Sequence, residues 1–200
     1  MKKRKYRYAL ILWGIGATLY MAGQMASVAG LLINDTVSAP RGVWRIEPLT
    51  GPVERGQMVS LCPPDDARFR LGRERGYLTY GWCPGGYERM LKMVGAVPGD
   101  VVSMTAQGVA VNGRLLDNSA PQARDGSGRV LNAMPQGAYT VAAGEVWLIS
   151  TYTSVSFDSR YFGPVASAQI EGGARPLWIE SQSSLTASVN RIRQQKERSS

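Results

Sequence analysis

The chain has 200 residues, which is enough for a short N-terminal segment and one domain of roughly 165 residues with an apolar core. It contains no histidine, so a Ser-His-Asp triad is excluded, and its two cysteines alone leave a zinc site short of ligands. The net charge of +8 lies at the ends, because residues 8–190 hold 14 Lys or Arg and 14 Asp or Glu, so the pattern gives no support for a basic nucleic-acid-binding face.

The N-terminus is a basic cluster, residues 2–7, followed by an apolar stretch from Ala9 to Ile33 whose most polar member is Gln24. A helix of that length covers a hydrocarbon layer about 30 Å thick. We therefore expect residues 1–33 to form a cytoplasmic stub and a transmembrane helix, with the rest of the chain on the outer side of the membrane. A cleavable signal peptide ending at Ser27-Val28-Ala29 stays open, whereas the basic start disfavours a buried core helix.

The remaining chain is expected to form one exported domain, residues 34–183, and a basic tail, residues 184–200. No internal repeat or linker indicates a second soluble domain. The positive ends suit anionic lipid headgroups of the inner membrane better than DNA, although the tail also fits a solvated, frayed end.

Ser38 comes five residues after the apolar stretch, within the run Ser38-Ala39-Pro40-Arg41-Gly42. A serine hydroxyl is a weak nucleophile until a base takes its proton. In a chain without histidine, lysine is the leading choice for that base, provided that burial lowers its pKa from about 10.4. Ser38 is therefore a candidate nucleophile close to a membrane surface.

The pattern beyond residue 34 is typical of β structure. Short apolar runs alternate with turns, and the 23 Gly and 11 Pro residues punctuate the chain at short intervals. Asn112-Gly113, between two such runs, is the strongest local signal for a hairpin. The expected strands are residues 57–61, 100–104, 109–111, 114–116, 139–141 and 145–149.

Three segments lack this pattern. Residues 65–81 are rich in arginine and glycine, and residues 118–128 are polar, as expected of a surface loop. Residues 184–196 place Leu185, Val189 and Ile192 at helical spacing, which predicts a late amphipathic helix.

Cys62 and Cys83 lie in the part of the chain that we expect to be exported. In an oxidising compartment they would form one disulfide that closes a loop of about 20 residues and contributes roughly 3 kcal/mol. Two free thiols are the alternative.

Lys92 lies in the apolar run from Met90 to Val97, so a strand could carry it into a dry site. Desolvation there would lower its pKa and allow it to act as a base. Most lysines on strands are instead solvated edge residues, and the local pattern alone does not decide between these readings.

Three motifs taken together resemble type I signal peptidases. Residues 91–100, Leu-Lys-Met-Val-Gly-Ala-Val-Pro-Gly-Asp, are similar to the lysine box of that family. Ser38-Ala39-Pro40 with Gly42 resembles its serine box, and residues 156–165, Ser-Phe-Asp-Ser-Arg-Tyr-Phe-Gly-Pro-Val, resemble its closing box. The resemblance spans about residues 9–170 and implies an antiparallel β catalytic domain.

Further details resemble the TraF-type branch of that superfamily, which serves conjugative transfer. These details are the proline two residues after Ser38 and the paired cysteines flanking Gly76-Tyr77-Leu78. The chain departs from the housekeeping enzymes because residues 149–153, Ile-Ser-Thr-Tyr-Thr, replace the usual Gly-Asp-Asn-Arg-Asp run.

The resemblance implies a role for each matching residue. Ser38 would be the nucleophile and Lys92 the general base, with Ser156 orienting the lysine. Asp158 and Arg160 match a structural ion pair, and the TraF branch also gives the aspartate a direct catalytic role. Thr36, two residues before the nucleophile, could join an oxyanion hole or merely cap a turn.

The implied function is acyl transfer without a cofactor or metal. The substrate would be a membrane-embedded propilin, and the other partners would be proteins of the conjugative transfer system. The alternatives are a general type I signal peptidase and a non-enzymatic, membrane-anchored pilus-assembly factor. An autocleaving repressor uses the same residue pair, but the N-terminal segment and the lack of a DNA-binding helix pair argue against it.

Overall fold

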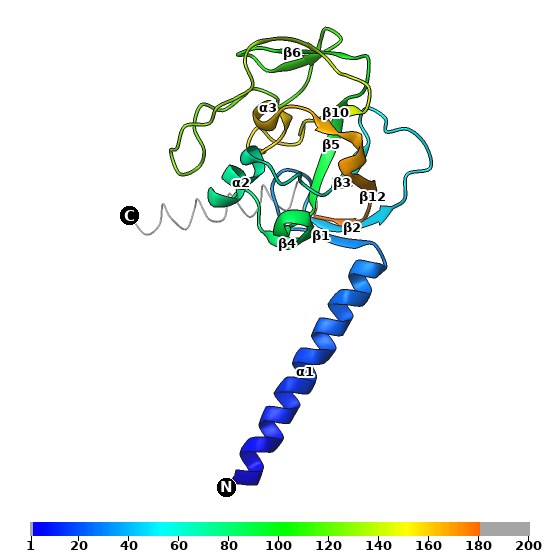
Figure 1. Ribbon diagram of the computed structural model, residues 1–200, viewed down its shortest axis with the longest axis vertical. Helices are drawn as coiled ribbons and strands as arrows, with labels where there is room; N and C mark the ends of the chain where they lie inside the picture. Colours follow the sequence, from blue (N-terminus) through cyan, green and yellow to red (C-terminus); the bar gives the residue numbers. More distant parts are fainter. Residues whose placement is uncertain (1, 181–200) are drawn as a thin grey trace. The chain divides into compact units, whose positions relative to one another are not determined.

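The computed structural model describes residues 2–180 and divides the chain into two compact units, residues 1–32 and 33–200, which are treated separately. In the first unit, α1 (Lys2–Val28) is a helix of 27 residues, drawn in blue in Figure 1. Gly30, at φ 72°, follows its end in the left-handed conformation that glycine adopts most readily. Among residues 2–180 no helix combines the length and apolarity needed to cross a membrane, so the predicted transmembrane helix is not found.

The second unit is built on two β-sheets. The larger sheet has seven strands in the order β1-β2-β12-β3-β5-β10-β11, and the smaller has four in the order β8-β7-β6-β9. The strands of the larger sheet are β1 (Leu31–Asn34), β2 (Gly42–Glu47), β12 (Ile170–Ile179), β3 (Met58–Leu61), β5 (Met90–Ala96), β10 (Glu145–Leu148) and β11 (Val165–Ala166). Those of the smaller sheet are β8 (Arg114–Leu115), β7 (Val109–Val111), β6 (Val101–Met104) and β9 (Gly137–Thr140).

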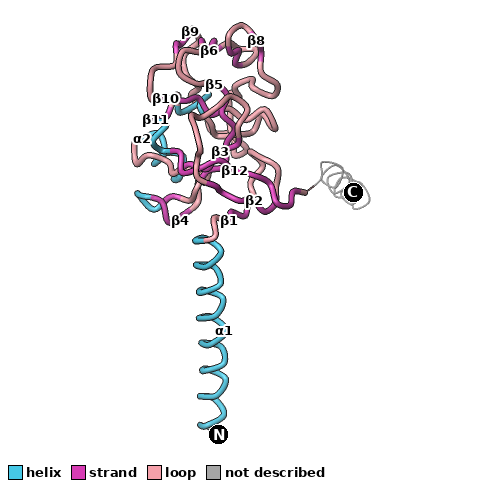
Figure 2. The backbone as a smooth tube through the Cα atoms, turned by 90° about the vertical axis from the view of Figure 1, so that its right-hand side faces the viewer, coloured by secondary structure: helices cyan, strands magenta, loops and turns pink. Residues whose placement is uncertain are grey.

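The strand pairings confirm a mainly β, antiparallel domain. Strand β5 lies between β3 and β10, and all of its registered partners run antiparallel to it. Figure 2 shows the strands of the smaller sheet at one end of the unit and β2, β3 and β12 at the other. The central position of β5 matters for function because this strand carries Lys92.

Every expected strand is present, with bounds shifted by a few residues. The hairpin prediction is also confirmed: β7 pairs with β8, and Asn112 and Gly113 take φ values of 50° and 82° between them. These positive φ values are those of the tight hairpin turn that an Asn-Gly pair favours. Residues 118–128 form an irregular, largely exposed loop, as predicted.

The segment between the cysteines, which has no strand pattern in the sequence, is partly helical. It contains α2 (Ala67–Glu74), and it ends in the short strand β4 (Tyr80–Cys83), which is followed by the 3₁₀ turn η1 (Pro84–Gly86). Asp66 begins α2 because its side chain accepts hydrogen bonds from the backbone N–H groups of Arg68 and Phe69. The remaining helical elements are α3 (Ser159–Phe162) and η2 (Ser167–Gln169).

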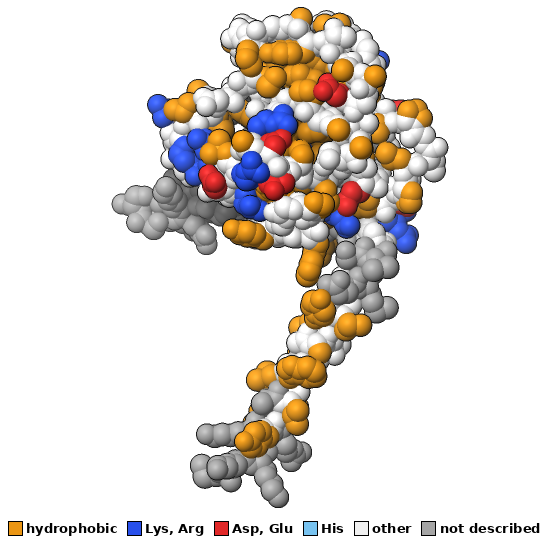
Figure 3. Space-filling model, viewed as in Figure 1, with side chains coloured by type: hydrophobic (Ala, Val, Ile, Leu, Met, Phe, Trp, Pro, Cys, Tyr) orange, Lys and Arg blue, Asp and Glu red, His pale blue; other side chains and the backbone are white. Residues whose placement is uncertain are grey.

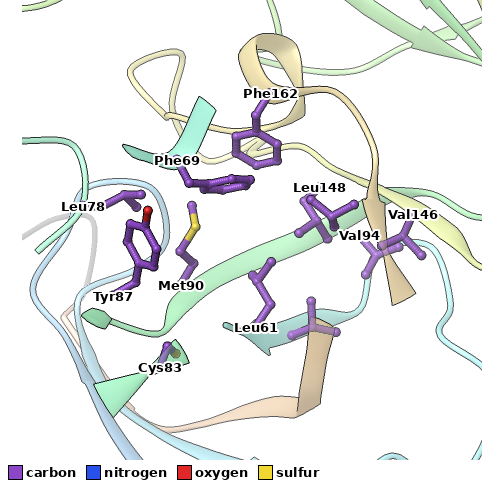
Figure 4. Packing of buried hydrophobic residues seen from close by; sticks show 12 residues of the cluster. Leu61, Phe69, Leu78, Cys83, Tyr87, Met90, Val94, Val146, Leu148 and Phe162 are labelled. Carbon is purple, nitrogen blue, oxygen red and sulfur yellow. The ribbon is translucent and has the colours of Figure 1, made fainter. Parts of the chain in front are cut away.

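Two apolar clusters hold the unit together. One packs α2 and α3 on the larger sheet, and Figure 4 shows the ring of Phe69 against that of Phe162, with Met90 and Leu148 nearby. The centroids of those two rings are 4.7 Å apart. The other cluster centres on Trp147 and Val102 and joins the smaller sheet to β10. Both clusters meet at β10, so that strand ties the two sheets together.

Gly42 fixes the junction between the serine segment and the larger sheet. A Cβ at this position would lie 2.1 Å from the carbonyl oxygen of Trp178, and the φ of 147° also favours glycine. The glycine of the predicted serine box is therefore required where β2 and β12 approach each other. The predicted amphipathic helix at residues 184–196 lies outside the described residues.

Candidate active site

Lys92 is placed in a dry position by its strand. In β5 it is paired with Val59 of the neighbouring strand β3, and it is only 4% exposed. Burial disfavours the ammonium form and lowers the pKa of Lys92 from 10.5 to about 8, while the charge of Asp158 acts to raise that pKa and the charge of Arg160 to lower it. With this pKa, a fraction of the Lys92 side chains carry a neutral amine near pH 7, and that amine can accept a proton.

Ser156 lies beside Lys92, as the sequence motif predicts. The Lys92 ammonium donates a hydrogen bond of 3.1 Å to Ser156 Oγ, and Ser156 is itself buried. This hydroxyl fixes the direction of the flexible lysine side chain. Ser156 also lines a pocket of about 150 Å³, together with Tyr77, Phe157 and Tyr161.

Asp158 and Arg160 form a fully buried ion pair under the site. Both side chains are 0% exposed, and Arg160 donates to the Asp158 carboxylate through Nε and Nη2, each at 2.8 Å. Burial would lower the pKa of Arg160, but the hydrogen bond and the charge of Asp158 outweigh it and hold that pKa above its ordinary value. Asp158 also accepts a bond of 3.1 Å from the backbone N–H of Ser150.

The guanidinium of Arg160 also forms hydrogen bonds with the backbone of two loops. It donates to the backbone carbonyls of Asn118, Ala120, Ser154 and Ser156. The ion pair therefore positions the segment that carries Ser156 and, through it, the lysine. This arrangement suits the structural role that the resemblance implies for the pair; that role and a direct catalytic role for Asp158 both stay predictions.

Ser38 lies in the short loop between β1 and β2 and is partly exposed. Its Oγ is 3.1 Å from Thr36 Oγ1, and its backbone carbonyl accepts a 2.8 Å bond from Ser150 Oγ. Within the described residues no hydrogen bond joins Ser38 Oγ to Lys92 Nζ; each hydroxyl or amine is bonded to its own neighbour. The two halves of the site are connected through Ser150 and Asp158 instead.

The sequence analysis missed two residues of this network, Asn34 and Ser150. Both are buried, at 6% and 2% exposure, and both hold the backbone of the serine loop. A single polar residue directly after an apolar stretch was the available signal for Asn34. The signal for Ser150 was the unusual run of residues 149–153, but the sequence does not show where the side chains of that run lie.

Cys62 and Cys83 form the predicted disulfide, with their Cα atoms 5.4 Å apart. The bridge ties β4 to the end of β3 and closes the loop that contains α2. Glu171 lies close enough to the two sulfur atoms to suggest a metal-ligand group. Because the sulfur atoms are bonded to each other, that cluster offers no thiolate to a metal.

The chain is similar to known signal peptidases and to proteins of conjugative transfer. The family model described as "Signal peptidase, peptidase S26" matches residues 8–179. The plasmid transfer protein TraF of Escherichia coli is 44% identical over 176 residues, covering 88% of this chain and 96% of the relative. The conjugal transfer protein TraF of Agrobacterium tumefaciens (strain 15955) is 40% identical over 176 residues, covering 87% and 97%.

Among solved structures, a signal peptidase I from Enterococcus faecalis V583 covers 62% of this chain and 97% of its own, with 18% identity and a TM-score of 0.36.

Proposed function

The chain belongs to the signal peptidase family S26, in its TraF-type branch, and from this premise we propose that it is a serine endopeptidase and acyltransferase that matures a propilin in a conjugative type IV secretion system. The observation that carries the proposal is the buried Lys92, whose pKa of about 8 and bond to Ser156 suit a general base. The names of the TraF relatives support the role in conjugation.

In the proposed reaction Ser38 Oγ attacks the carbonyl carbon of the scissile bond and its proton passes to Lys92 Nζ. Lys92 then gives the proton to the leaving amine as the C–N bond breaks, which leaves an acyl ester on Ser38. Water resolves the ester to a linear product, whereas attack by the substrate's own N-terminal amine gives a cyclic one. Both outcomes use the same residues.

A periplasmic location of the second unit is part of the proposal. The Cys62–Cys83 disulfide supports it, because disulfides form and persist in oxidising compartments such as the bacterial periplasm. The expected partners are the propilin and other conjugative transfer proteins.

The test uses donor cells that lack the protein and carry wild-type, Ser38→Ala, Lys92→Ala or Ser127→Ala versions. Ser127 is exposed in the loop of residues 118–128, so its variant controls for loss of a serine hydroxyl away from the site. We expect the first two variants to accumulate unprocessed pilin and the control to process it normally. Mass spectrometry of the mature pilin separates the linear from the cyclic product, which lacks one water.

The other two functions give different results in the same experiment. Cleavage of a broad panel of secretory presequences by the purified protein would favour a general signal peptidase. Undiminished conjugation with Ser38→Ala would favour a non-enzymatic assembly factor and would refute the proposed chemistry.

A further inference from the structure

The loop that carries Ser38 is organised by one buried amide, that of Asn34. Its Nδ2 lies 3.3 Å from the backbone carbonyl oxygen of Thr36, 3.1 Å from that of Ala39 and 3.0 Å from that of Pro40. Carbonyl oxygens only accept hydrogen bonds, so the group facing them must be the NH₂ of the amide. The orientation of the Asn34 side chain is thereby fixed by its three partners.

The opposite side of the amide then faces Thr36. Asn34 Oδ1 is 2.7 Å from Thr36 Oγ1 and 3.3 Å from the Thr36 backbone N. A carbonyl oxygen carries no hydrogen, so Thr36 must donate its single hydroxyl proton to Asn34. In the 3.1 Å contact between Thr36 Oγ1 and Ser38 Oγ, the donor is consequently Ser38.

These contacts form a directed chain in which Ser38 donates to Thr36 and Thr36 donates to Asn34. We propose that Asn34 is the positioning residue of the nucleophile: it fixes the serine loop through three carbonyls and sets the direction of the Ser38 hydroxyl through Thr36. This inference rests on the proposed function, because it concerns how Ser38 is made ready to attack. Asn34 is a positioning residue because it acts through Thr36 and the loop backbone and not on the reacting atoms themselves.

The direction of the hydrogen bonds gives Thr36 a role that differs from both alternatives that the sequence left open, an oxyanion-hole donor and a turn cap. Its proton is committed to Asn34, so in this arrangement its oxygen accepts from the nucleophile instead of donating to an oxyanion. For attack, the Ser38 O–H turns from Thr36 towards Lys92. That O–H bond then breaks and a Lys92 N–H bond forms, while the serine oxygen bonds to the substrate carbon and the carbonyl π electrons move onto its oxygen. Thr36 and Asn34 keep their own protons throughout.

The loop is held from a second side by Ser150, whose hydroxyl donates to the Ser38 carbonyl at 2.8 Å. The backbone of the loop is thus held by Asn34 and Ser150, and also by Trp44, whose indole N–H donates to the Pro40 carbonyl at 3.1 Å. Of these three side chains, Asn34 is the one that also acts on the reacting hydroxyl, through Thr36. This separation allows the two effects of Asn34, on the backbone and on the hydroxyl, to be resolved by a double substitution with Thr36.

The experiment measures acylation of the purified full-length protein by p-nitrophenyl acetate, a small acyl donor. The burst of p-nitrophenolate and the mass of the acetylated protein report the same event. The variants are Asn34→Leu, which keeps the branched shape of asparagine and removes its polar atoms, Thr36→Val and the double variant. Ser38→Ala gives the background, and Thr105→Val is the matched control because it removes a hydroxyl that ties a loop of the smaller sheet.

We expect Asn34→Leu to slow acylation at saturating ester by about a hundredfold, since a misplaced nucleophile loses its near-attack geometry. The ester concentration at half-saturation should not change, and the pH midpoint of acylation should stay near the pKa of Lys92, about 8. The double variant should lose less than the product of the two single losses, because the residues act in one chain. Thr105→Val should react like the wild type.

Acylation of Asn34→Leu at the wild-type rate would overturn the inference. A pH midpoint displaced toward 10.5 would also overturn it, because the loss would then come from water entering the site and not from positioning. If Asn34→Leu does not fold, Asn34→Ala is read in its place, with a melting curve matched to Thr105→Val. A wild-type protein that reacts no faster than Ser38→Ala refutes the proposed function and this inference together.

Discussion

The pH dependence of catalysis is the sharpest consequence of the buried lysine. The pKa of Lys92 falls from 10.5 to about 8, which corresponds to about 3 kcal/mol between its two protonation states. With that pKa about one molecule in ten carries a neutral Lys92 at pH 7, against about one in three thousand for an exposed lysine of pKa 10.5. Burial therefore accounts for almost all of the neutral Lys92 that is present at pH 7 to act as a base.

The assay is the rate constant kcat/KM for acylation of the purified protein between pH 6 and pH 10. We expect it to rise about tenfold per pH unit up to pH 7 or so and to level off above the midpoint near 8. Lys92→Arg should be inactive at every pH because a guanidinium does not lose its proton in this range. A flat profile, or one still rising at pH 10, would refute the reasoning.

The same pKa predicts how stability changes with pH. The folded-state pKa of Lys92 lies below its unfolded value, so the unfolded chain binds more protons between about pH 8 and pH 10.5. The cost of burying the charge is therefore complete below pH 8 and disappears as the pH rises toward 10.5, a gain of about 3 kcal/mol. Urea denaturation of the wild type and Lys92→Met should show this gain only in the wild type, and equal pH profiles would contradict it.

Two further predictions concern the framework of the site. Arg160→Met should lower the free energy of unfolding by about 3–5 kcal/mol, because it leaves the Asp158 carboxylate buried without its partner; an unchanged urea midpoint would show that the pair is dispensable. Replacing both Cys62 and Cys83 by alanine should cost about 3 kcal/mol, since the loop between them gains freedom in the unfolded chain. Reducing agent should have no effect on the denaturation of that double variant while destabilising the wild type, and equal sensitivity of both would rule out the bridge as the cause.

Local chemistry explains why several features could be predicted from the sequence. The Asn112-Gly113 turn depends on φ values that these two residues adopt by themselves, and the disulfide prediction needed only two cysteines in a segment that we expect to be exported. The motifs around Ser38 and Lys92 likewise marked the residues that the structure connects through Ser150 and Asp158.

Other features depend on partners that are distant in the chain. The helix α2 was missed because its short, arginine-rich sequence has little apolar periodicity, and its helical form depends on the Asp66 cap and on packing of Phe69 against Phe162. The transmembrane prediction relied on a run without charges, and no described helix meets the joint requirement of length and apolarity.

The sequence by itself determined which groups can do chemistry: a serine and a lysine in a chain without histidine, each within a recognisable motif. Only the tertiary structure decided that Lys92 is dry, because the groups beside its side chain, Ser156 and the Asp158–Arg160 pair, come from a distant part of the chain. It also decided the direction of the hydrogen bonds at Ser38, since that direction follows from the three carbonyls that surround the Asn34 amide. Burial and hydrogen-bond direction are properties of surroundings, and those surroundings exist only once the chain has folded.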